Sequence, residues 1–485
     1  MNASDIVRRQ AALTPHAPAF IDARGHGVTY AQLAAVIDVV AVRLRAAGIA
    51  PQSVAVLATT DLYKFLVTAL AMGRAGIVFA PATLPVEYTD VAVLDEGQAG
   101  NGCVRTFALD AFTPVPGATV ALADPHPGGA APFTLLPSSG TTATPRFTPV
   151  SHDLALLRCD PAALAFARMP GGRRAQASRQ ACMLAPTGGY GLSSAMLTLR
   201  AGGAVMEAPA AVEATAAWLA ASGVEYLVLS PVMLERIVHA LPPGRTPNTL
   251  AALEVGGGAL APRVRALAQE RLCEHVIVSY GATETGRIGW GPAHRYDGMA
   301  DTGGFPLPDV RVEIVGDDDA PVPPGQEGTV RLRSPRNASR YLHDADASAA
   351  VFRAGWVYPG DRGRLEPDGF LRLVGRVDDR INRGGVKFDP EAVESLMTGF
   401  GDVADVALVG FPDAAGVTRL CAVVVAGAGY DGDVFAARCR DELGIATPDF
   451  LMEVRALPRN ANGKLMRREL SEAARRYHAQ QAARH

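Results

Sequence analysis

The sequence predicts an α/β fold, with a large N-terminal domain of layered β-sheets and helices and a small, mobile α+β C-terminal domain. The chain has 485 residues, more than the roughly 250–300 at which a single hydrophobic core stops growing. Its first two-thirds alternates short apolar runs with amphipathic helical stretches, and the pattern changes near residue 378. We therefore expect domains at residues 1–376 and 377–485.

Strands and helices of the large domain follow from its apolar pattern. Val224–Leu229 is a mostly apolar run typical of a buried strand, and Pro231 suits the first turn of a helix over Val232–Ala240. The same reasoning predicts strands at Ser53–Leu57, Leu253–Val255 and Val276–Ser279, and helices at Leu62–Met72 and Arg263–Arg271. Repeated strand, glycine turn and helix units favour a layered sheet with largely parallel strands.

A different texture begins after about residue 300. Two further strands, Thr329–Arg333 and Phe370–Val374, belong to a meander beyond the polar turn Asp317–Gly328. The small domain is predicted to hold strands Val403–Val409 and Leu420–Val425, with helices at Pro390–Met397 and Val434–Leu443. The Ala/Arg/Gln-rich segment Ser471–His485 indicates a frayed terminal helix.

Composition excludes several classes of function. The hydrophobic share is 48%, the charged share 20% and the net charge −3, and no basic run indicates a nucleic-acid partner. The N-terminal segment lacks the apolar core of a signal peptide, and no apolar stretch is long enough to span a bilayer. Six scattered cysteines without a CxxC pair indicate reduced thiols. We expect a cytoplasmic protein without a membrane span.

Lysine is rare in this chain. Of 46 basic residues only Lys64, Lys387 and Lys464 are lysines. Lysine offers a compact point charge where arginine offers a planar fork. A lysine retained in such a background indicates a position at which that chemistry is needed.

Two motifs in the large domain favour phosphate and metal chemistry. The run Pro137–Arg146 (PSSGTTATPR) is a Ser/Thr/Gly loop whose hydroxyl and backbone N–H groups can surround a phosphate, although it lacks the spacing of a Walker loop. The run Tyr280–Glu284 (YGATE) directly follows a predicted strand, where α/β sheets bind ligands. Glu284 suits a magnesium ligand and Tyr280 suits a stacking partner for a purine. Taken singly, the first motif is equally compatible with a surface linker, and the second also suits an ordinary strand-exit turn.

Three further motifs surround the predicted domain boundary. Asp361, in the turn Trp356–Asp361, can accept hydrogen bonds from ribose hydroxyls. The charged segment Gly375–Lys387 suits a hinge that carries cations toward a phosphate, and Lys464 follows Asn-Gly in a loop before a helix. Alone, each also suits an ordinary turn, linker or solvated loop lysine.

In this order the five motifs resemble the signature of the adenylate-forming superfamily, which includes acyl-CoA and aryl-CoA synthetases, adenylation domains of nonribosomal peptide synthetases and firefly luciferase. The resemblance covers roughly residues 10–470. It implies an acid–thiol ligase that joins a carboxylic acid to AMP, releases pyrophosphate and passes the acyl group to a thiol. It also implies ATP, Mg²⁺ and coenzyme A as the small molecules used.

The resemblance assigns a role to each matching position. It places catalytic roles at Lys464, which bridges carboxylate and α-phosphate, at Thr283 and at the magnesium ligand Glu284. It places ATP or AMP binding at Ser138, Ser139, Gly140, Thr141, Thr142, Gly257, Gly258, Tyr280, Asp361, Arg376 and Lys387. It makes Asp378 the hinge and Gly385 part of the thiol tunnel. Relatives rotate the small domain about this hinge between the two half-reactions.

The acyl pocket departs most from the pattern of the superfamily. Gly188 stands where many relatives have histidine, and Gly189 stands where aryl-acid relatives have asparagine. Because glycine leaves volume and offers no side-chain partner, we expect a mainly apolar aromatic or medium-chain acid ahead of 2,3-dihydroxybenzoate or an amino acid. Arg287, three residues past Glu284, suits either a surface position or a contact with a second acidic group on the substrate.

Two alternatives to a coenzyme A ligase stay open. The first is a stand-alone adenylation enzyme that loads phosphopantetheine on a separate acyl carrier protein, since no carrier segment lies in this sequence. The second is a catalytically inactive nucleotide-binding protein, which the retention of Glu284, Asp361, Arg376 and Lys464 disfavours.

Overall fold

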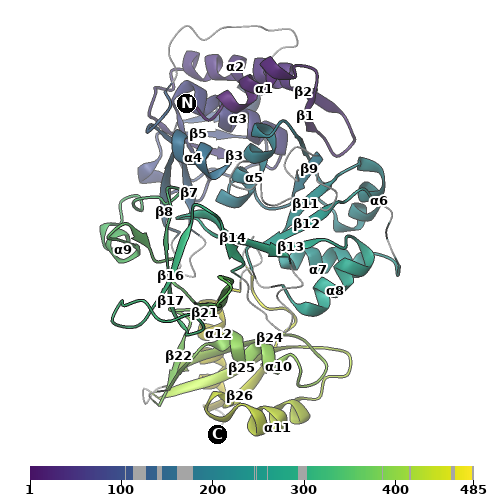
Figure 1. The fold of residues 1–485 in the computed structure, drawn as a ribbon, viewed down its shortest axis with the longest axis vertical. Coiled ribbons are helices and arrows are strands. Elements are labelled where there is room, and N and C mark those ends of the chain that lie inside the picture. Colours follow the sequence, from purple (N-terminus) through teal and green to yellow (C-terminus); the bar gives the residue numbers. More distant parts are fainter. Residues whose placement is uncertain are drawn as a thin grey trace.

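The computed structural model describes residues 1–103, 105–112, 127–138, 145–160, 179–244, 246, 248–258, 260–292, 303–384, 386–413, 417–459 and 465–482. In these ranges a large N-terminal part built on three sheets stands above a small C-terminal sheet (Figure 1). The predicted α/β class is confirmed. An exposed turn at Val377 and Asp378 lies between the two parts, and the boundary at 376/377 itself remains a prediction.

The first sheet carries the Ser/Thr/Gly loop at one edge. Its strands lie in the order β6-β5-β3-β4-β7-β8, and all pair in parallel except β7 with β8. The strand bounds are β3 (Val54–Ala58), β4 (Val78–Ala80), β5 (Val91–Leu94), β6 (Thr106–Ala108), β7 (Pro132–Pro137) and β8 (Phe147–Ser151). Helices α2 (Tyr30–Ala46) and α3 (Leu62–Ala75) pack on it, and the single-turn segments η1 (Val86–Tyr88) and η2 (Leu109–Phe112) join its strands.

Local sequence signals explain the limits of these helices. A capping box between Thr29 and Gln32 starts α2, and the side chain of Asp61 caps α3. Gly76 ends α3 in the left-handed conformation with φ +78°. The predicted strand at Ser53–Leu57 and helix at Leu62–Met72 are therefore present, each with slightly shifted ends.

The second sheet carries most of the predicted site residues at its strand ends. In the described chain its order is β15-β14-β13-β12-β11-β9-β10-β1-β2, with parallel pairing from β10 through β13. The strand bounds are β1 (Pro18–Ile21), β2 (Gly27–Thr29), β9 (Arg179–Cys182), β10 (Ala204–Met206), β11 (Tyr226–Leu229), β12 (Ala252–Gly256), β13 (Val276–Ala282), β14 (Gly286–Pro292) and β15 (Phe305–Pro306). The associated helices are α1 (Asp5–Leu13), α5 (Gly189–Arg200), α6 (Val212–Ser222), α7 (Pro231–Ala240) and α8 (Pro262–Arg271). Helix α4 (His152–Arg158) packs instead on β7 and β8 of the first sheet.

One boundary in this sheet differs from the expectation. The strand predicted to stop at Ser279 continues to Ala282, because β14 pairs with it in an antiparallel hairpin that carries the ladder past Tyr280. Tyr280 is thus a strand residue and Glu284 lies in the hairpin turn. The sequence analysis expects both residues directly after the strand.

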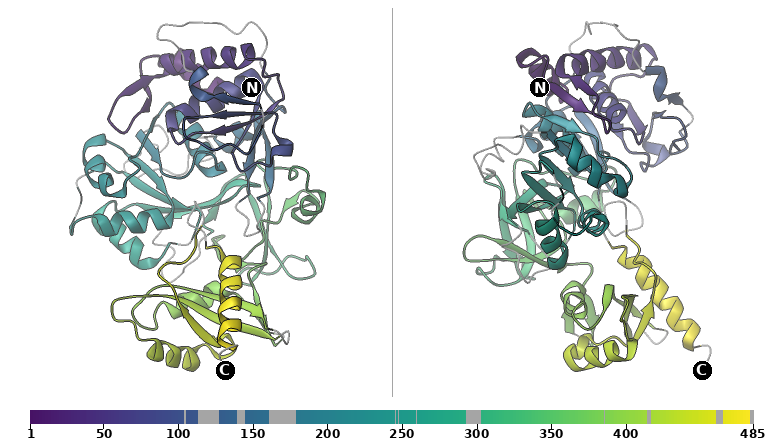
Figure 2. Two further views of the ribbon diagram at one scale, coloured as in Figure 1. Left: turned by 180° about the vertical axis from the view of Figure 1, so that it is seen from behind. Right: turned by 90° about the vertical axis from the view of Figure 1, so that its right-hand side faces the viewer.

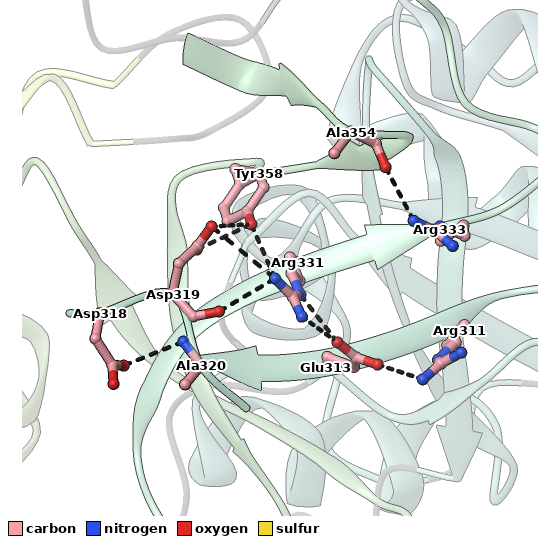
Figure 3. Close-up of polar contacts among 9 residues, drawn as sticks. All are labelled: Arg311, Glu313, Asp318, Asp319, Ala320, Arg331, Arg333, Ala354 and Tyr358. Atoms are coloured by element: carbon pink, nitrogen blue, oxygen red, sulfur yellow. Dashed lines mark hydrogen bonds and ion pairs between the residues drawn. The ribbon is translucent and has the colours of Figure 1, made fainter. Parts of the chain in front are cut away.

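The third sheet is a small meander next to the small domain. Its strands are β16 (Arg311–Val315), β17 (Gly328–Arg333), β18 (Phe352–Arg353), β19 (Trp356–Val357), β20 (Asp361–Leu365) and β21 (Leu371–Arg376), with α9 (Ala345–Val351) before β18. Arg311, Arg331 and Arg333 each place a guanidinium 4.5–5.5 Å from the ring centre of Trp356. Glu313 accepts hydrogen bonds from Arg311 and Arg331, as Figure 3 shows. Acidic partners thus fix this arginine cluster.

The described part of the small domain contains a three-stranded sheet, on which helices pack, and a separate two-stranded sheet. Its strands are β22 (Ile381–Arg383), β23 (Val386–Phe388), β24 (Val403–Pro412), β25 (Thr418–Ala426) and β26 (Phe450–Glu453). Its helices are α10 (Pro390–Met397), α11 (Gly432–Glu442), the single turn η6 (Gly444–Ala446) and α12 (Arg467–Ala482), which runs along the outside of the domain (Figure 2). The predicted terminal helix is present and begins earlier than expected.

Polar contacts join the two parts. Arg362 of β20 forms an ion pair with Asp389, and Nη2 of Arg263 in α8 donates to the carbonyl oxygen of Ala404 at 2.9 Å. Among the described residues, no helix is both long and apolar enough to cross a membrane.

Candidate active site

Three predicted nucleotide-binding residues meet at the junction of the second and third sheets. Asp361 begins β20 directly opposite Arg376 of β21, and Tyr280 reaches it from β13. Nη1 of Arg376 donates to Oδ1 of Asp361 at 2.7 Å, and the hydroxyl of Tyr280 donates to Oδ2. An ionised carboxylate has about four acceptor positions, so Asp361 retains capacity for further donors such as ribose hydroxyls.

Electrostatics keeps this cluster in one protonation state. Burial, followed by the nearby charge of Asp361, raises the pKa of Tyr280 well above its ordinary value. Burial by itself lowers the pKa of Arg376, and the charge of Asp361 offsets this so that the pKa is raised overall. At neutral pH Tyr280 is therefore a neutral donor and Arg376 a cation, and both hold Asp361 in place.

Glu284 lies in the turn between β13 and β14 and is 7% exposed. The hydroxyl of Tyr341 donates to Oε1 of Glu284 at 2.5 Å. Arg158 of α4 donates to the carbonyl oxygens of Thr283 at 3.0 Å and Glu284 at 2.8 Å. The turn is thus fixed through its backbone while one carboxylate oxygen stays available to a ligand.

Glu284 fits the magnesium role that the sequence predicts. Magnesium is commonly held by one or two carboxylates together with substrate phosphates and water, instead of a cage of protein ligands. In the described part of the chain no group of three or more His, Cys, Asp or Glu residues forms such a cage. A single positioned carboxylate therefore matches a metal ion that arrives with a nucleotide.

The Ser/Thr/Gly loop begins beside this turn. Ser138 and Arg146 close its neck, since the backbone N–H of Ser138 donates to the Arg146 carbonyl at 2.7 Å. Oγ1 of Thr283 donates to the carbonyl oxygen of Pro137 at 3.2 Å, which ties the neck to the Glu284 turn. The predicted phosphate-binding residues Ser139, Gly140, Thr141 and Thr142 lie outside the described residues.

The small-domain predictions are only partly described. Lys464 and Gly385 lie outside the described residues, as does the side chain of Lys387, whose backbone is in β23. The loop that holds Lys464 is closed at its base by a bridge between Arg459 and Leu465. Asp378 is exposed in the turn after β21, a position compatible with a hinge.

The glycines predicted to open the acyl pocket have close neighbours. Gly188 caps α5, and a Cβ on Gly189 would lie 3.1 Å from Cδ1 of Leu136 in β7. A Cβ on Gly256 would lie 2.3 Å from the ring of Tyr190. Gly257 has φ +88°, and Gly258 has only ordinary contacts. Leu136 therefore occupies part of the volume expected beside Gly189, and Tyr190 lies against Gly256.

Arg287 is buried, with its side chain 13% exposed. Its Nη2 lies 2.6 Å from Oε1 of Glu254, a β12 residue that is 1% exposed. Tyr226 of β11 donates to Oε2 of Glu254 at 2.6 Å, and Tyr190 of α5 donates to Oε1. Of the two positions that the sequence left open for Arg287, the surface position is wrong.

Sequence reasoning missed four of these contributors: Glu254, Tyr226, Tyr341 and Arg158. Glu254 had a usable signal, because a charged residue inside the apolar run ALEVG is rarely buried without a partner. Tyr341 and Arg158 are far from their partners in sequence, so nothing local indicated them.

Comparisons with known proteins agree with this geometry. A family model described as AMP-binding enzyme matches residues 7–90 and 82–342, and one described as AMP-binding enzyme C-terminal domain matches residues 392–464. A salicylyl-CoA synthase/salicylate adenylyltransferase from a Streptomyces species is 34% identical over 53% of this chain and 48% of its own length. A feruloyl-CoA synthase from an Amycolatopsis species is 27% identical over 95% of this chain and 97% of its own.

The structural comparison covers almost the whole chain. ATP-bound MatB from Rhodopseudomonas palustris has a TM-score of 0.85 and 24% identity, and the match covers 98% of this chain and 99% of that one. At this identity the likeness establishes the fold. Together with the family models that match both parts of the sequence, it shows that the chain belongs to the AMP-binding enzyme family, within the adenylate-forming superfamily of ligases.

Proposed function

We propose that the chain is an AMP-forming ligase that activates an aromatic carboxylic acid with ATP and transfers the acyl group to coenzyme A. The observation that carries this proposal is the meeting of Tyr280, Asp361 and Arg376 beside the Glu284 turn. Tyr280 comes from the second sheet, whereas Asp361 and Arg376 are paired in the third. With Glu284 they bring a ribose acceptor, an aromatic side chain and a metal ligand together.

Each group has a role that follows from its chemistry. Asp361 accepts from the ribose hydroxyls, held by Arg376 and by the hydroxyl of Tyr280. Glu284 would hold the magnesium ion, which neutralises phosphate charge when bound. The loop that starts at Ser138 surrounds the β- and γ-phosphates with its N–H and hydroxyl groups.

Lys464 supplies the remaining positive charge. Attack of a carboxylate on the α-phosphorus brings two anions together, and a positioned cation stabilises the charge that develops in the transition state. Rotation of the small domain at Asp378 then replaces Lys464 by the segment around Gly385, so that a thiol reaches the acyl-adenylate. One cleft thereby serves both half-reactions.

The relatives support an aromatic acid and coenzyme A as the thiol. Salicylate and ferulate, named in two of them, are both aromatic acids, and both proteins are named for coenzyme A products. A separate carrier protein bearing phosphopantetheine presents the same thiol chemistry, so it stays as the second candidate acceptor.

Pyrophosphate exchange tests the first half-reaction. The enzyme is incubated with ATP, labelled pyrophosphate, Mg²⁺ and one acid at a time, including benzoate, salicylate, cinnamate and octanoate. We expect exchange that depends on the acid, and exchange with none of them would refute the proposal. Thioester formation with free coenzyme A, compared with formation on a phosphopantetheinylated carrier protein, then separates the two acceptors.

Variants of the lysines test the proposed role of Lys464. Lys464→Ala should reduce exchange by orders of magnitude and leave thioester formation from preformed acyl-AMP largely intact. Lys64→Arg is the matched control, because Lys64 is paired with Asp95 at 2.8 Å and Asp110 at 3.1 Å in the large domain. Equal damage to both half-reactions in the Lys464 variant would show that the assigned role is wrong.

A further inference from the structure

A buried polar quartet, formed by Glu254, Arg287, Tyr190 and Tyr226, lies beside the nucleotide cluster. Its members come from β12, β14, α5 and β11, which Figure 1 shows converging in the centre of the large domain. The surrounding face of the sheet is apolar, with Val228, Ala252 and Ile277 packed there. Four polar side chains concentrated on an otherwise apolar face need a physical reason.

Stability alone is a poor reason for this arrangement. Taking a carboxylate and a guanidinium out of water costs several kcal/mol per ion by general accounts, and apolar replacements of buried ion pairs are often neutral or stabilising. The quartet therefore costs free energy that an apolar core would save. Such a cost is typical of groups retained to bind or discriminate a ligand.

The quartet lies next to the glycines that the sequence predicts to line the acyl pocket. Tyr190 directly follows Gly188 and Gly189 at the start of α5, and its ring packs against Gly256. Glu254 is two residues before Gly256, so both lie on the same face of β12. Arg287 pairs with Gly281 in the hairpin that presents Glu284. These positions place the quartet where the far end of the proposed acid substrate would lie.

Hydrogen-bond accounting shows what the quartet can still bind. Glu254 accepts from Tyr190 and Arg287 at Oε1 and from Tyr226 at Oε2. An ionised carboxylate has about four acceptor positions, so one position at Oε2 is left. A guanidinium has five N–H donors, more than Glu254 and Tyr190 can accept. The quartet thus offers an acceptor and a donor side by side.

Charge selects among the groups that could use this pair. Burial, followed by the charge of Glu254, raises the pKa of both Tyr190 and Tyr226 well above the ordinary value, so both are neutral donors at pH 7. The charges of Glu254 and Arg287 cancel. A second carboxylate on the substrate would be attracted by Arg287 but repelled by Glu254, and the reverse holds for an ammonium group, so neither meets a net opposite charge. A neutral hydroxyl can both donate and accept, and it meets neither repulsion.

We propose that this quartet is a specificity site that binds the hydroxyl of a hydroxyl-bearing aromatic acid, with the hydroxyl donating to Oε2 of Glu254 and accepting from Arg287. This inference rests on the proposed acid-activating function and refines its substrate. It revises the expectation of a mainly apolar acid, because the partners missing at Gly188 and Gly189 are supplied by β11, β12 and β14. It makes no use of a second acidic group, which the sequence had left open for Arg287.

The test compares benzoate with 2-, 3- and 4-hydroxybenzoate in pyrophosphate exchange, measured as kcat/KM. In the wild type at least one hydroxy isomer should exceed benzoate roughly tenfold or more, since sites built to bind a hydroxyl discriminate strongly against analogues that lack it. Glu254→Gln and Tyr226→Phe should bring this ratio toward one while benzoate is still activated. The Tyr226 variant keeps the ion pair between Arg287 and Glu254, so its ratio can be interpreted even if the Glu254 variant folds poorly.

Glu313→Gln is the matched control. Its ion pair with Arg331 has side chains 15% and 13% exposed and lies in the third sheet (Figure 3). This variant should leave the ratio unchanged. Equal rates with benzoate and all three hydroxy isomers in the wild type, or an unchanged ratio in both quartet variants, would overturn the specificity site alone. Exchange with no acid in the panel would overturn the proposed function itself.

Discussion

At the scale of single residues, three buried carboxylates are each held by the hydroxyl of a tyrosine. Asp361, Glu284 and Glu254 each accept a hydrogen bond from a tyrosine hydroxyl, donated by Tyr280, Tyr341 and Tyr226 respectively. Burial raises the pKa of each of these tyrosines, so the hydroxyls remain donors across the neutral range. A neutral donor orients a carboxylate without cancelling the charge that a metal ion or ribose must meet.

This device predicts how magnesium dependence responds to Tyr341. Tyr341→Phe removes the donor to Oε1 of Glu284 and leaves the carboxylate less well oriented. Loss of a group that orients a metal ligand typically costs roughly 10–100-fold in metal affinity. Titration of Mg²⁺ in the exchange assay should show a half-saturating concentration raised about tenfold, with a larger rise in Glu284→Ala.

Tyr358→Phe serves as the control for that measurement. Its hydroxyl is bonded to Asp319 and Arg331 in the third sheet, away from the Glu284 turn. Magnesium dependence should be that of the wild type. An unchanged Mg²⁺ titration in Glu284→Ala would show that Glu284 does not bind the metal ion.

Buried thiols predict an alkaline loss of stability. Burial raises the pKa of Cys159, Cys182 and Cys439 to about 11 and that of Cys421 to about 12, from 9.0. Because the unfolded chain loses these protons first, their contribution is intact below pH 9 and is lost as pH rises through the folded values. Each thiol contributes about 1 kcal/mol of this loss at pH 10.

Urea denaturation at pH 7.5 and pH 10 measures the effect. The free energy of unfolding should fall between the two values, and the fall should be smaller in Cys421→Ala, which lacks one of the thiols. Cys103→Ala, whose residue is partly exposed, is the matched control and should show the wild-type fall. The same pH dependence in wild type and Cys421→Ala would exclude this thiol as a contributor.

At the scale of elements, the C-terminal end of β12 packs against α5 through Gly256 and Tyr190. Gly256 permits Tyr190 to lie against the strand, because a Cβ there would be 2.3 Å from the tyrosine ring. Gly256→Ala should therefore displace Tyr190 and with it one donor to Glu254. We expect KM for the acid to rise roughly tenfold, following the cost of overpacking of about 1–3 kcal/mol, and KM for ATP to change much less.

Gly258→Ala distinguishes this contact from a general effect at the strand end. A Cβ at Gly258 would be 3.6 Å from the nearest atom, Cγ of Pro231, which is an ordinary contact. It should therefore leave KM for the acid close to that of the wild type. If both alanine variants raise KM for the acid equally, the specific contact with Tyr190 is not the cause.

Elements were predictable where the apolar pattern is local. The strands at β3, β11 and β12 and the helices at α7 and α8 follow from local apolar runs that keep one period. The quartet was not predictable, because Glu254, Arg287 and the two tyrosines meet only through sheet pairing and the docking of α5. The extension of β13 through Tyr280 likewise depends on β14, whose glycine-rich sequence GRIGWGP has low strand propensity of its own.

At the scale of the whole molecule, the sequence set the two-part organisation and the structure adds how the parts meet. The ion pair of Arg362 with Asp389 and the bond from Arg263 to Ala404 hold the small domain by polar contacts. Arg263 has an exposed side chain, so its contact contributes about 0–1 kcal/mol, whereas the side chains of the Arg362–Asp389 pair are mostly buried. The contact from Arg263 is weak enough to break during the rotation that we propose for the small domain.

Asp378 is the position at which that motion can be tested. It lies in the exposed turn after β21. The residue before it, Val377, donates its backbone N–H to the carbonyl oxygen of Gly360 at 2.8 Å. Proline fixes φ and restricts the residue before it, so Asp378→Pro should hold the small domain in one orientation. We expect one half-reaction to survive and the other to fall by orders of magnitude, measured as pyrophosphate exchange and as thioester formation from preformed acyl-AMP. Asp378→Ala, which removes the side chain and keeps the backbone free, should retain both. Full overall turnover in the proline variant would rule out rotation at this residue.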